Sequence, residues 1–123
     1  MSADDIFSAN WFSVIGQFQG NQIIAAGGLE NFRDEVLLRS VVTALDHRGQ
    51  GFAEKLVRQL HRRASIASFQ DSWLLTTTAS DYFANKFGYS VIERTTAPLP
   101  IKNSGQFSQL CPDSAVLMRK SLN

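Results

Sequence analysis

The sequence predicts a mixed α/β fold of the α+β kind, with helices packed on the faces of one sheet. Three observations support this prediction. Three β-prone runs follow one another between residues 11 and 45. An amphipathic helical pattern begins shortly after them, at Gly51. Short strand-like and helix-like segments then alternate up to residue 119, so the predicted order is βββ, turn, α, β, α, β, loop, β.

The first two strands are predicted to form a β-hairpin. Residues 11–19 and 22–29 alternate apolar and polar side chains or run apolar. Gly20 and Asn21 lie between them, and both residue types tolerate the positive φ that tight hairpin turns need. Before the hairpin, the Ser-Ala-Asp-Asp run that opens residues 2–9 is consistent with a short capped helix.

A nearly continuous apolar run at residues 36–45 predicts the central strand. It follows a polar break, the Asn-Phe-Arg-Asp-Glu stretch of residues 31–35. Strands that are apolar on both faces are typical of sheets that are covered on both sides. We therefore expect this strand to be buried on both faces.

Apolar side chains recur with helical spacing after Gly51. Phe52, Leu56, Val57 and Leu60 occupy positions i, i+4, i+5 and i+8, and the charged residues fall largely elsewhere. The pattern predicts a helix with one buried stripe.

The next two elements are shorter. Residues 73–77 are β-prone and predict a strand. Ser80 and Asp81 offer an N-cap for a helix over residues 82–87, and Gly88 is a residue type that commonly ends helices.

Two further strands complete the predicted sheet, at residues 89–94 and 115–119. Between them, Pro98 and Pro100 are expected to interrupt any regular element. Residues 101–110 fit either a short helix or an ordered loop.

The junction between the central strand and the long helix has the composition of an anion site. Free N–H groups and the positive end of the helix dipole attract phosphate at a helix N-terminus. Gly49 and Gly51 permit positive φ and close approach of a ligand, Arg48 supplies a forked cation, and Ala53 keeps the next turn slim. Pyrophosphate suits such a site.

The stretch from Arg48 to Ala53 resembles the Arg/Gln-x-x-Gly-x-Gly/Ala motif of the GNAT superfamily of acyl-CoA N-acyltransferases. In that superfamily the motif holds the pyrophosphate of coenzyme A. Residues 36–45 resemble its fourth strand, residues 73–77 its fifth strand, and residues 82–89, which end in Phe-Gly-Tyr, its fourth helix. The resemblance spans residues 12–122 and implies a mixed, mostly antiparallel sheet.

A narrower resemblance is to a GNAT subgroup described as arsenic-resistance N-acetyltransferase-like. It rests on Leu-Arg-Ser at 38–40, Leu-Leu-Thr-Thr-Thr-Ala at 74–79, and the stretch at 106–115. Against the family pattern the chain is N-terminally shortened, since only about ten residues precede the first predicted strand. In the family, the N-terminal segment that is missing here usually forms one wall of the acceptor site. A homodimer partner, a longer parent protein or a smaller, more open site would each account for the difference.

The resemblance implies a set of coenzyme-binding residues. The backbone of the central strand would hydrogen-bond the pantetheine arm, the glycine loop would bind the pyrophosphate, and a threonine after the fifth strand would contact the arm or the acceptor. The threonines also fit a plain β-prone run. The predicted coenzyme-binding residues are Val41, Val42, Thr43, Arg48, Gly49, Gln50, Gly51, Phe52, Ala53 and Thr78.

Acyl transfer to an amine needs a neutral amine, a fixed N–H donor for the oxyanion and stabilisation of the leaving thiolate. A backbone N–H near Val42 is the expected donor. Glu30 and Glu35, at the predicted strand ends, are the candidate bases, with a solvated charge as the alternative for each. The tyrosine that many family members use as the acid is Ala84 here, and Tyr82 is expected to point about 200° away around the helix.

The remaining candidate residues have simpler interpretations. Arg58, Arg62 and Arg63 follow the loop and fit a solvated helix face or contacts with the adenosine 3′-phosphate or another anion. His47 is expected to support the phosphate turn and His61 to lie at the surface or at a rim. Cys111, without catalytic partners in sequence, is expected to be a buried structural thiol.

Composition excludes several classes. A chain of 123 residues with 44% hydrophobic content makes one domain, 1–123, and a net charge of +1 argues against nucleic acid as a partner. No apolar run reaches membrane-spanning length and the Met-Ser-Ala-Asp-Asp start is acidic, so we expect a soluble cytoplasmic protein without a membrane contact. One cysteine permits neither an intrachain disulfide nor a multi-thiolate metal site, and no metal is expected.

The expected function is an N-acetyltransferase that moves an acetyl group from acetyl-CoA to a primary amine of a small molecule by direct attack. The alternative is a non-catalytic acyl-CoA-binding module that regulates a partner protein. Binding of nucleic acid is a third, disfavoured possibility.

Overall fold

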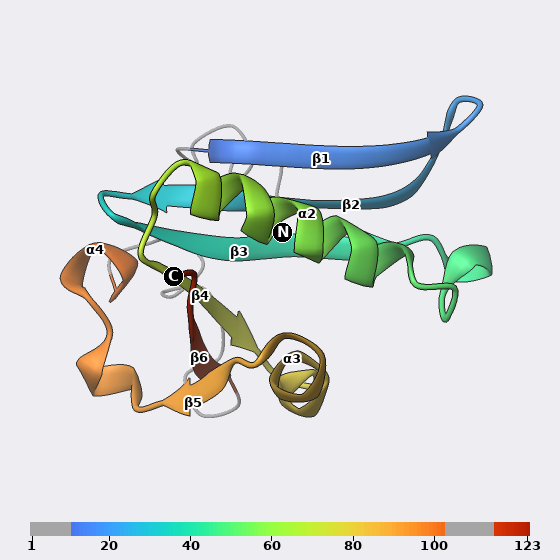
Figure 1. The fold of residues 1–123 in the computed structure, drawn as a ribbon. Helices are drawn as coiled ribbons and strands as arrows, with labels where there is room; N and C mark the ends of the chain where they lie inside the picture. Colours follow the sequence, from blue (N-terminus) through green and yellow to red (C-terminus); the bar gives the residue numbers. More distant parts are fainter. Residues whose placement is uncertain (1–10, 103–114) are drawn as a thin grey trace.

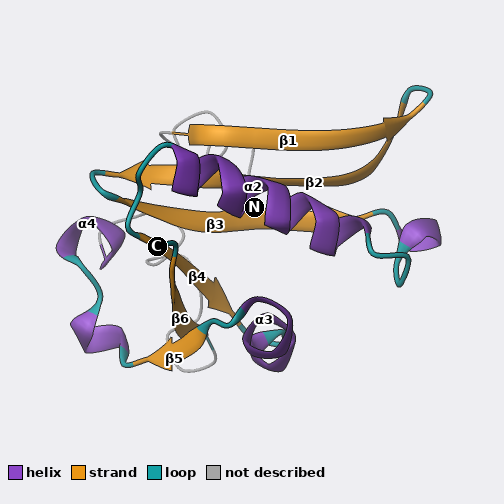
Figure 2. Cartoon of the chain, viewed as in Figure 1, coloured by secondary structure: helices purple, strands orange, loops and turns teal. Residues whose placement is uncertain are grey.

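The computed structural model describes residues 11–102 and 115–123, which form one six-stranded sheet with helices on it (Figures 1 and 2). The strand order is β1-β2-β3-β4-β6-β5. Every neighbouring pair is antiparallel except β3 and β4, which are parallel. The strands are β1 (Trp11–Gln19), β2 (Gln22–Phe32), β3 (Glu35–Thr43), β4 (Asp71–Thr76), β5 (Ser90–Ile92) and β6 (Val116–Ser121). The mixed, mostly antiparallel sheet predicted from the sequence is confirmed.

The predicted hairpin is formed by β1 and β2, with Gly20 in the turn at a φ of 60°. The second strand continues three residues past its predicted end, to Phe32, so only Arg33 and Asp34 make the turn into β3. The polar Asn31 does not break the strand because pairing with Val36 of β3 satisfies its backbone.

The long helix α2 (Phe52–Ile66) lies across one face of β1, β2 and β3, as Figure 1 shows. Its stripe of Leu56, Val57 and Leu60 is fully buried against Leu29 and other apolar side chains of these strands. A second core lies on the sheet's other face. Its buried members are Leu37, Trp73, Leu75, Ala97, Ile101, Ala115 and Leu117.

Strand β3 departs from the predicted central strand at its far end. It begins buried but ends at Thr43, Val42 is 58% exposed, and the 3-10 turn η1 (Leu45–His47) follows. The register explains this, since Gly28 pairs with Arg39 and Ala26 pairs with Val42. Two steps along β2 match three along β3, so β3 carries a bulge, and a bulge bends its strand and increases the local twist.

The middle elements correct the predicted start of one helix and confirm its predicted end. Helix α3 (Ser80–Phe87) takes Ala79 as its N-cap residue, so Ser80 and Asp81 lie in its first turn. Thr76 Oγ1 accepts the Ala79 N–H at 3.0 Å and supports this turn instead. The predicted stop is confirmed, because Gly88 has a φ of 77° at the C-cap.

The last third of the chain differs more from prediction. The predicted strand at 89–94 shortens to β5 and gives way to the 3-10 turn η2 (Arg94–Thr96). Pro100 does not interrupt the next element but lies inside the short helix α4 (Leu99–Lys102). Proline is compatible with the first turn of a helix, where its missing N–H has no intrahelical acceptor. The predictions for residues 2–9, most of 101–110 and Cys111 fall outside the described residues.

Among residues 11–102 and 115–123, no helix has both the length and the apolar character that crossing a bilayer requires.

Candidate functional site

The loop before α2 has the backbone that the sequence predicted. Gly49 and Gly51 adopt φ values of 79° and 84°. A Cβ built on either residue meets no atom within 4 Å, so the space in front of both is open. Gly51 is the N-cap residue of α2, and no side chain caps this helix. The first-turn N–H groups therefore face the open loop, which is the arrangement that binds phosphate oxygens.

Side chains around the loop fix its position against the sheet. Arg48 Nε donates to the carbonyl oxygen of Thr43 at 3.4 Å, which ties the loop to the end of β3. His47 Nε2 lies 3.2 Å from Gln19 Oε1, and the His47 ring meets Phe52 edge to face at 5.8 Å. His47 thus braces the glycine loop, and its role beside a phosphate stays a prediction.

A groove continues from this loop to the gap between β3 and β4. The two strands pair only at their first three positions, the last being Leu37 with Trp73. A cavity of about 330 Å³ occupies the gap beyond that pair, and one of about 760 Å³ lies along the glycine loop. Val41 and Ala79 line both, so the two cavities are neighbours along one groove.

The structure gathers nearly all of the predicted coenzyme-binding residues along this groove. Thr78 lines the smaller cavity. Gln50 lines neither cavity, and its Nε2 donates to the Asp46 carbonyl oxygen at 3.4 Å, within the loop. The remaining members of the set line the larger cavity: Val41, Val42, Thr43, Arg48, Gly49, Gly51, Phe52 and Ala53.

Helix α3 supplies a wall that sequence reasoning missed. Ala79, Tyr82 and Lys86 line the larger cavity opposite the glycine loop. Their spacing of three and four residues places them on one helical face, and that periodicity is the signal that could have identified them. Burial raises the pKa of the Tyr82 hydroxyl, with Glu54 adding to the increase and Arg58 opposing it. Ala84 is exposed and lines neither cavity.

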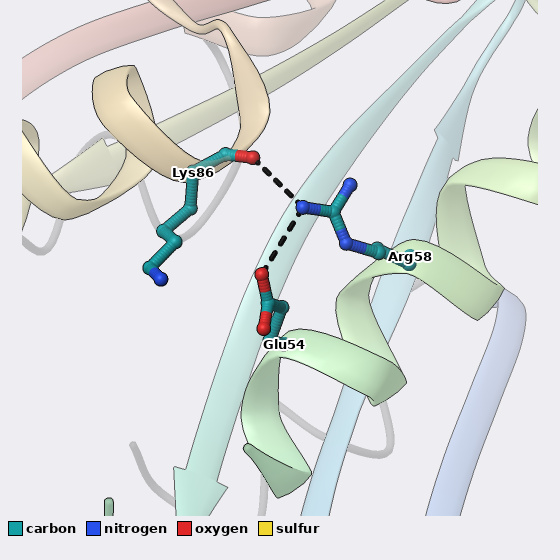
Figure 3. Close-up of polar contacts among 3 residues, drawn as sticks. All are labelled: Glu54, Arg58 and Lys86. Atoms are coloured by element: carbon teal, nitrogen blue, oxygen red, sulfur yellow. Dashed lines mark hydrogen bonds and ion pairs between the residues drawn. The ribbon is translucent and has the colours of Figure 1, made fainter.

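A polar bridge holds the two walls together, as Figure 3 shows. Arg58 Nη2 of α2 donates to Glu54 Oε1 on its own helix and to the carbonyl oxygen of Lys86 at the end of α3, both at 3.1 Å. The guanidinium carbon also lies 5.1 Å from the centroid of the Phe87 ring. The bridge sets the distance between the glycine loop's helix and the helix that carries Tyr82.

Glu30 is not the solvated strand-end charge that was one of its two predicted roles. It is 6% exposed, and its Oε1 accepts from Arg39 Nη1 at 2.8 Å in a buried ion pair. Trp11 covers the guanidinium, 5.5 Å from ring centroid to Cζ. Arg39 also lines the smaller cavity, so the pair lies close to the groove with one carboxylate oxygen already engaged.

Glu35 lies at the closed end of the groove. It pairs with Asp71 at the start of β3, where β3 and β4 are still joined. Roughly 20 Å of strand separates it from Val41, at about 3.3 Å per residue. Burial raises the pKa of this carboxyl, while the neighbouring Trp73 side chain lowers it and the charge of Asp71 raises it further. The structure therefore places Glu35 away from the open part of the groove, although it is a diagonal neighbour of Glu30, because Phe32 pairs with Glu35 and Glu30 pairs with Leu37.

Comparisons with known proteins show which solved structures share this architecture. No protein-family model matches the sequence, and neither does any curated protein sequence. Solved structures do match. N-acetylglutamate synthase from Neisseria gonorrhoeae, complexed with coenzyme A and N-acetyl-glutamate, superposes on 89% of this chain with a TM-score of 0.77 at 12% identity. A GNAT-family acetyltransferase from Staphylococcus aureus covers 86% of the chain with a TM-score of 0.69 at 17% identity.

A third match is Rv2747 from Mycobacterium tuberculosis in complex with CoA, which covers 89% of the chain with a TM-score of 0.73 at 19% identity. The chain spans 26%, 64% and 76% of these three proteins, in the order given. Similarity at such low identity shows the fold, and the GNAT-like fold expected from the sequence is confirmed. The narrower resemblance to the arsenic-resistance subgroup stays a prediction.

Proposed function

We propose that the chain binds acetyl-CoA along the groove and transfers its acetyl group to a primary amine of a small molecule. One observation carries the proposal. An uncapped helix N-terminus with two open glycines leads directly into a gap between two parted parallel strands. A diphosphate fits the first feature, and a long, narrow arm with amide groups fits the second. Two solved proteins of the same fold contain coenzyme A.

The loop residues and the free edge of β3 divide the binding between them. Arg48 and the N–H groups after Gly51 neutralise and hold the diphosphate. The edge of β3 that β4 leaves unpaired offers its backbone at Val41, Val42 and Thr43 to the amides of the pantetheine arm, as a sheet edge does to an added strand. Thr78 contacts the arm from the β4 side. Gln50 braces the loop from behind.

The bulged end of β3 supplies the electrostatic part of the reaction. The N–H of Val42 donates to the thioester carbonyl oxygen and stabilises the negative charge that develops there. As the new C–N bond forms the C–S bond breaks, and the departing coenzyme thiolate takes a proton from water. Holding amine and thioester together contributes much of the remaining acceleration. The amine nitrogen must lose its proton, and Glu30 is the nearer of the two predicted carboxylates, acting through water because Arg39 engages it directly. The position of Glu35 gives it no part in this proposal.

A second candidate function rests on Ala84. The position that carries an acidic tyrosine in many GNAT enzymes has no hydroxyl here, and Tyr82 faces the loop rather than the gap between the strands. A module that binds acyl-CoA without turnover, and signals its occupancy to a partner protein, needs the loop and the groove but not the acid.

Calorimetry with acetyl-CoA on a matched glycine pair tests the binding step. In Gly51→Ala a methyl group occupies the space where the diphosphate must approach, and we expect acetyl-CoA affinity to fall at least tenfold. Gly20→Ala is the control, because Gly20 has a similar left-handed φ and open surroundings but lies at the hairpin turn. The left-handed backbone costs each variant about 1–2 kcal/mol of stability. Equal affinity in both variants would contradict the assignment of the loop.

Release of the coenzyme thiol with a panel of amines then separates the two functions. Multiple turnovers on any amine support the transferase. Stoichiometric binding of acetyl-CoA with no thiol release on any amine supports the regulatory module and rejects the enzyme.

A further inference from the structure

A second cavity lies between the C-terminal half of α2 and the end of the chain. It measures about 480 Å³. Figure 1 shows the C-terminus below the last turns of α2. The lining residues come from these two segments only: Arg58, His61, Arg62, Ser65, Lys120, Ser121, Leu122 and Asn123. Three of them carry cationic side chains, and none is an aspartate or a glutamate.

This cavity is separate from the coenzyme groove. It shares no lining residue with the cavity along the glycine loop. His61 lies ten positions after Gly51, which corresponds to roughly 15 Å along the helix axis at 1.5 Å per residue. An adenosine 3′-phosphate held near the loop is therefore not the natural partner of Arg62.

The cationic side chains of the cavity differ in whether they already form ion pairs or hydrogen bonds. Arg58 is engaged by Glu54 and by the carbonyl oxygen of Lys86. Arg62 and Lys120 form no ion pair with the residues that the structure describes. Arg63, the third arginine of the predicted basic face, points elsewhere and donates to Ser13 Oγ at 3.0 Å. The arginine cluster of the sequence is thus divided, and only part of it faces this cavity.

A fixed polar side chain forms the inner wall. His61, expected at the surface or at a rim, is only 8% exposed, and its Nε2 lies 2.7 Å from the Tyr89 hydroxyl. That hydroxyl lies 2.7 Å from Ser72 Oγ, and Tyr89 and Ser72 are both buried. Burial, together with the smaller effects of the Lys120 and Arg58 charges, lowers the pKa of His61 to about 4. Lys120 and Arg58 thus place positive charge beside the His61 wall of the cavity.

We propose that this cavity is a second binding site, for a small phosphate-type oxyanion, either inorganic phosphate or the phosphate group of a monoester. Arg62 and Lys120 approach the cavity from α2 and β6 and provide the charge, while the His61 wall gives the site a rigid back. Neutralising the local positive field stabilises the bound anion and the fold together.

The two histidines of the chain make the test specific. His47 lines the coenzyme cavity and His61 lines this one, so their imidazole NMR signals report on the two sites separately. Inorganic phosphate and glycerol phosphate are titrated into the full chain at constant ionic strength, with chloride as the reference salt. We expect a saturable shift of the His61 signal. Tighter binding of glycerol phosphate identifies a phosphate ester as the ligand, and equal or tighter binding of inorganic phosphate identifies the free ion.

Charge-neutral variants complete the test. Arg62→Gln and Lys120→Gln should each weaken phosphate binding at His61 about tenfold, whereas Arg63→Gln removes the same charge from the same helix and should leave it unchanged. Thermal unfolding checks that each variant is folded. A shift that does not saturate, a shift of His47 alone, or an equal loss in Arg63→Gln overturns the proposal. None of these outcomes depends on whether the chain binds acetyl-CoA.

Discussion

Acidification should destabilise this protein through His61. The neutral ring is buried against Tyr89, and burial together with Lys120 and Arg58 lowers the pKa of His61 from 6.5 to about 4. The folded state therefore binds the histidine's proton less readily than the unfolded state. The stability contributed by the neutral ring is fully present above pH 6.5 and is lost as the pH falls through 6.5 towards 4.

The size of the effect follows from the two pKa values. At 1.36 kcal/mol per pH unit, lowering the pKa from 6.5 to about 4 corresponds to about 3 kcal/mol lost below pH 4. For a small domain with a total stability of about 5–15 kcal/mol, this is a large fraction. Carboxylates titrate in part of the same range, so the measurement needs a variant in which this single contribution is absent.

Urea denaturation of wild type and His61→Gln between pH 7.5 and 4 provides the assay. Glutamine retains a polar partner for Tyr89 but does not titrate. We therefore expect the free energy of unfolding of His61→Gln to fall by about 3 kcal/mol less than that of wild type across this pH range. NMR titration of the His61 imidazole gives the folded-state pKa directly. Parallel curves for the two proteins, or a measured pKa near 6.5, would refute the reasoning.

Two further predictions concern stability. Leu60→Ala should lower the free energy of unfolding by about 2–5 kcal/mol, because Leu60 lies on the fully buried face of α2. Ile66→Ala, at a position that is 77% exposed, should change it by less than about 0.5 kcal/mol. Thermal unfolding of both variants measures the difference, and similar losses in the two would contradict the packing. Glu30→Gln should lower the free energy of unfolding by about 3 kcal/mol, since Arg39 loses the carboxylate of its buried ion pair. Adding Arg39→Met to this variant should restore part of that loss. Additive losses in the double-mutant cycle would show that the two side chains are not coupled.

Local sequence was sufficient wherever a short-range rule decides the structure. The hairpin turn follows from the conformational freedom of Gly20, and the backbone of the glycine loop from the same freedom at Gly49 and Gly51. The buried stripe of α2 follows from helical periodicity, because side chains three or four residues apart share one face. Most of the predicted coenzyme-binding set lines one groove for a similar reason, since these residues are contiguous along β3 and its loop.

Long-range contacts decided the rest. Nothing near Glu30 in the sequence indicates Arg39, because the two are joined only when β2 and β3 pair. The bulge that exposes Val42 and the separation of β3 from β4 depend on how whole strands are matched and twisted.

The sequence by itself thus determined a sheet with a long helix on it and a glycine loop before that helix, since backbone freedom and side-chain periodicity act over a few residues. Only the tertiary structure decided what surrounds that loop and where the second half of α2 points. Tyr82, on another helix, lines the same cavity as the loop, and Lys120, on the last strand, lines the same cavity as Arg62. Such contacts form when distant segments pack together, and their energies are therefore not encoded in any one stretch of residues.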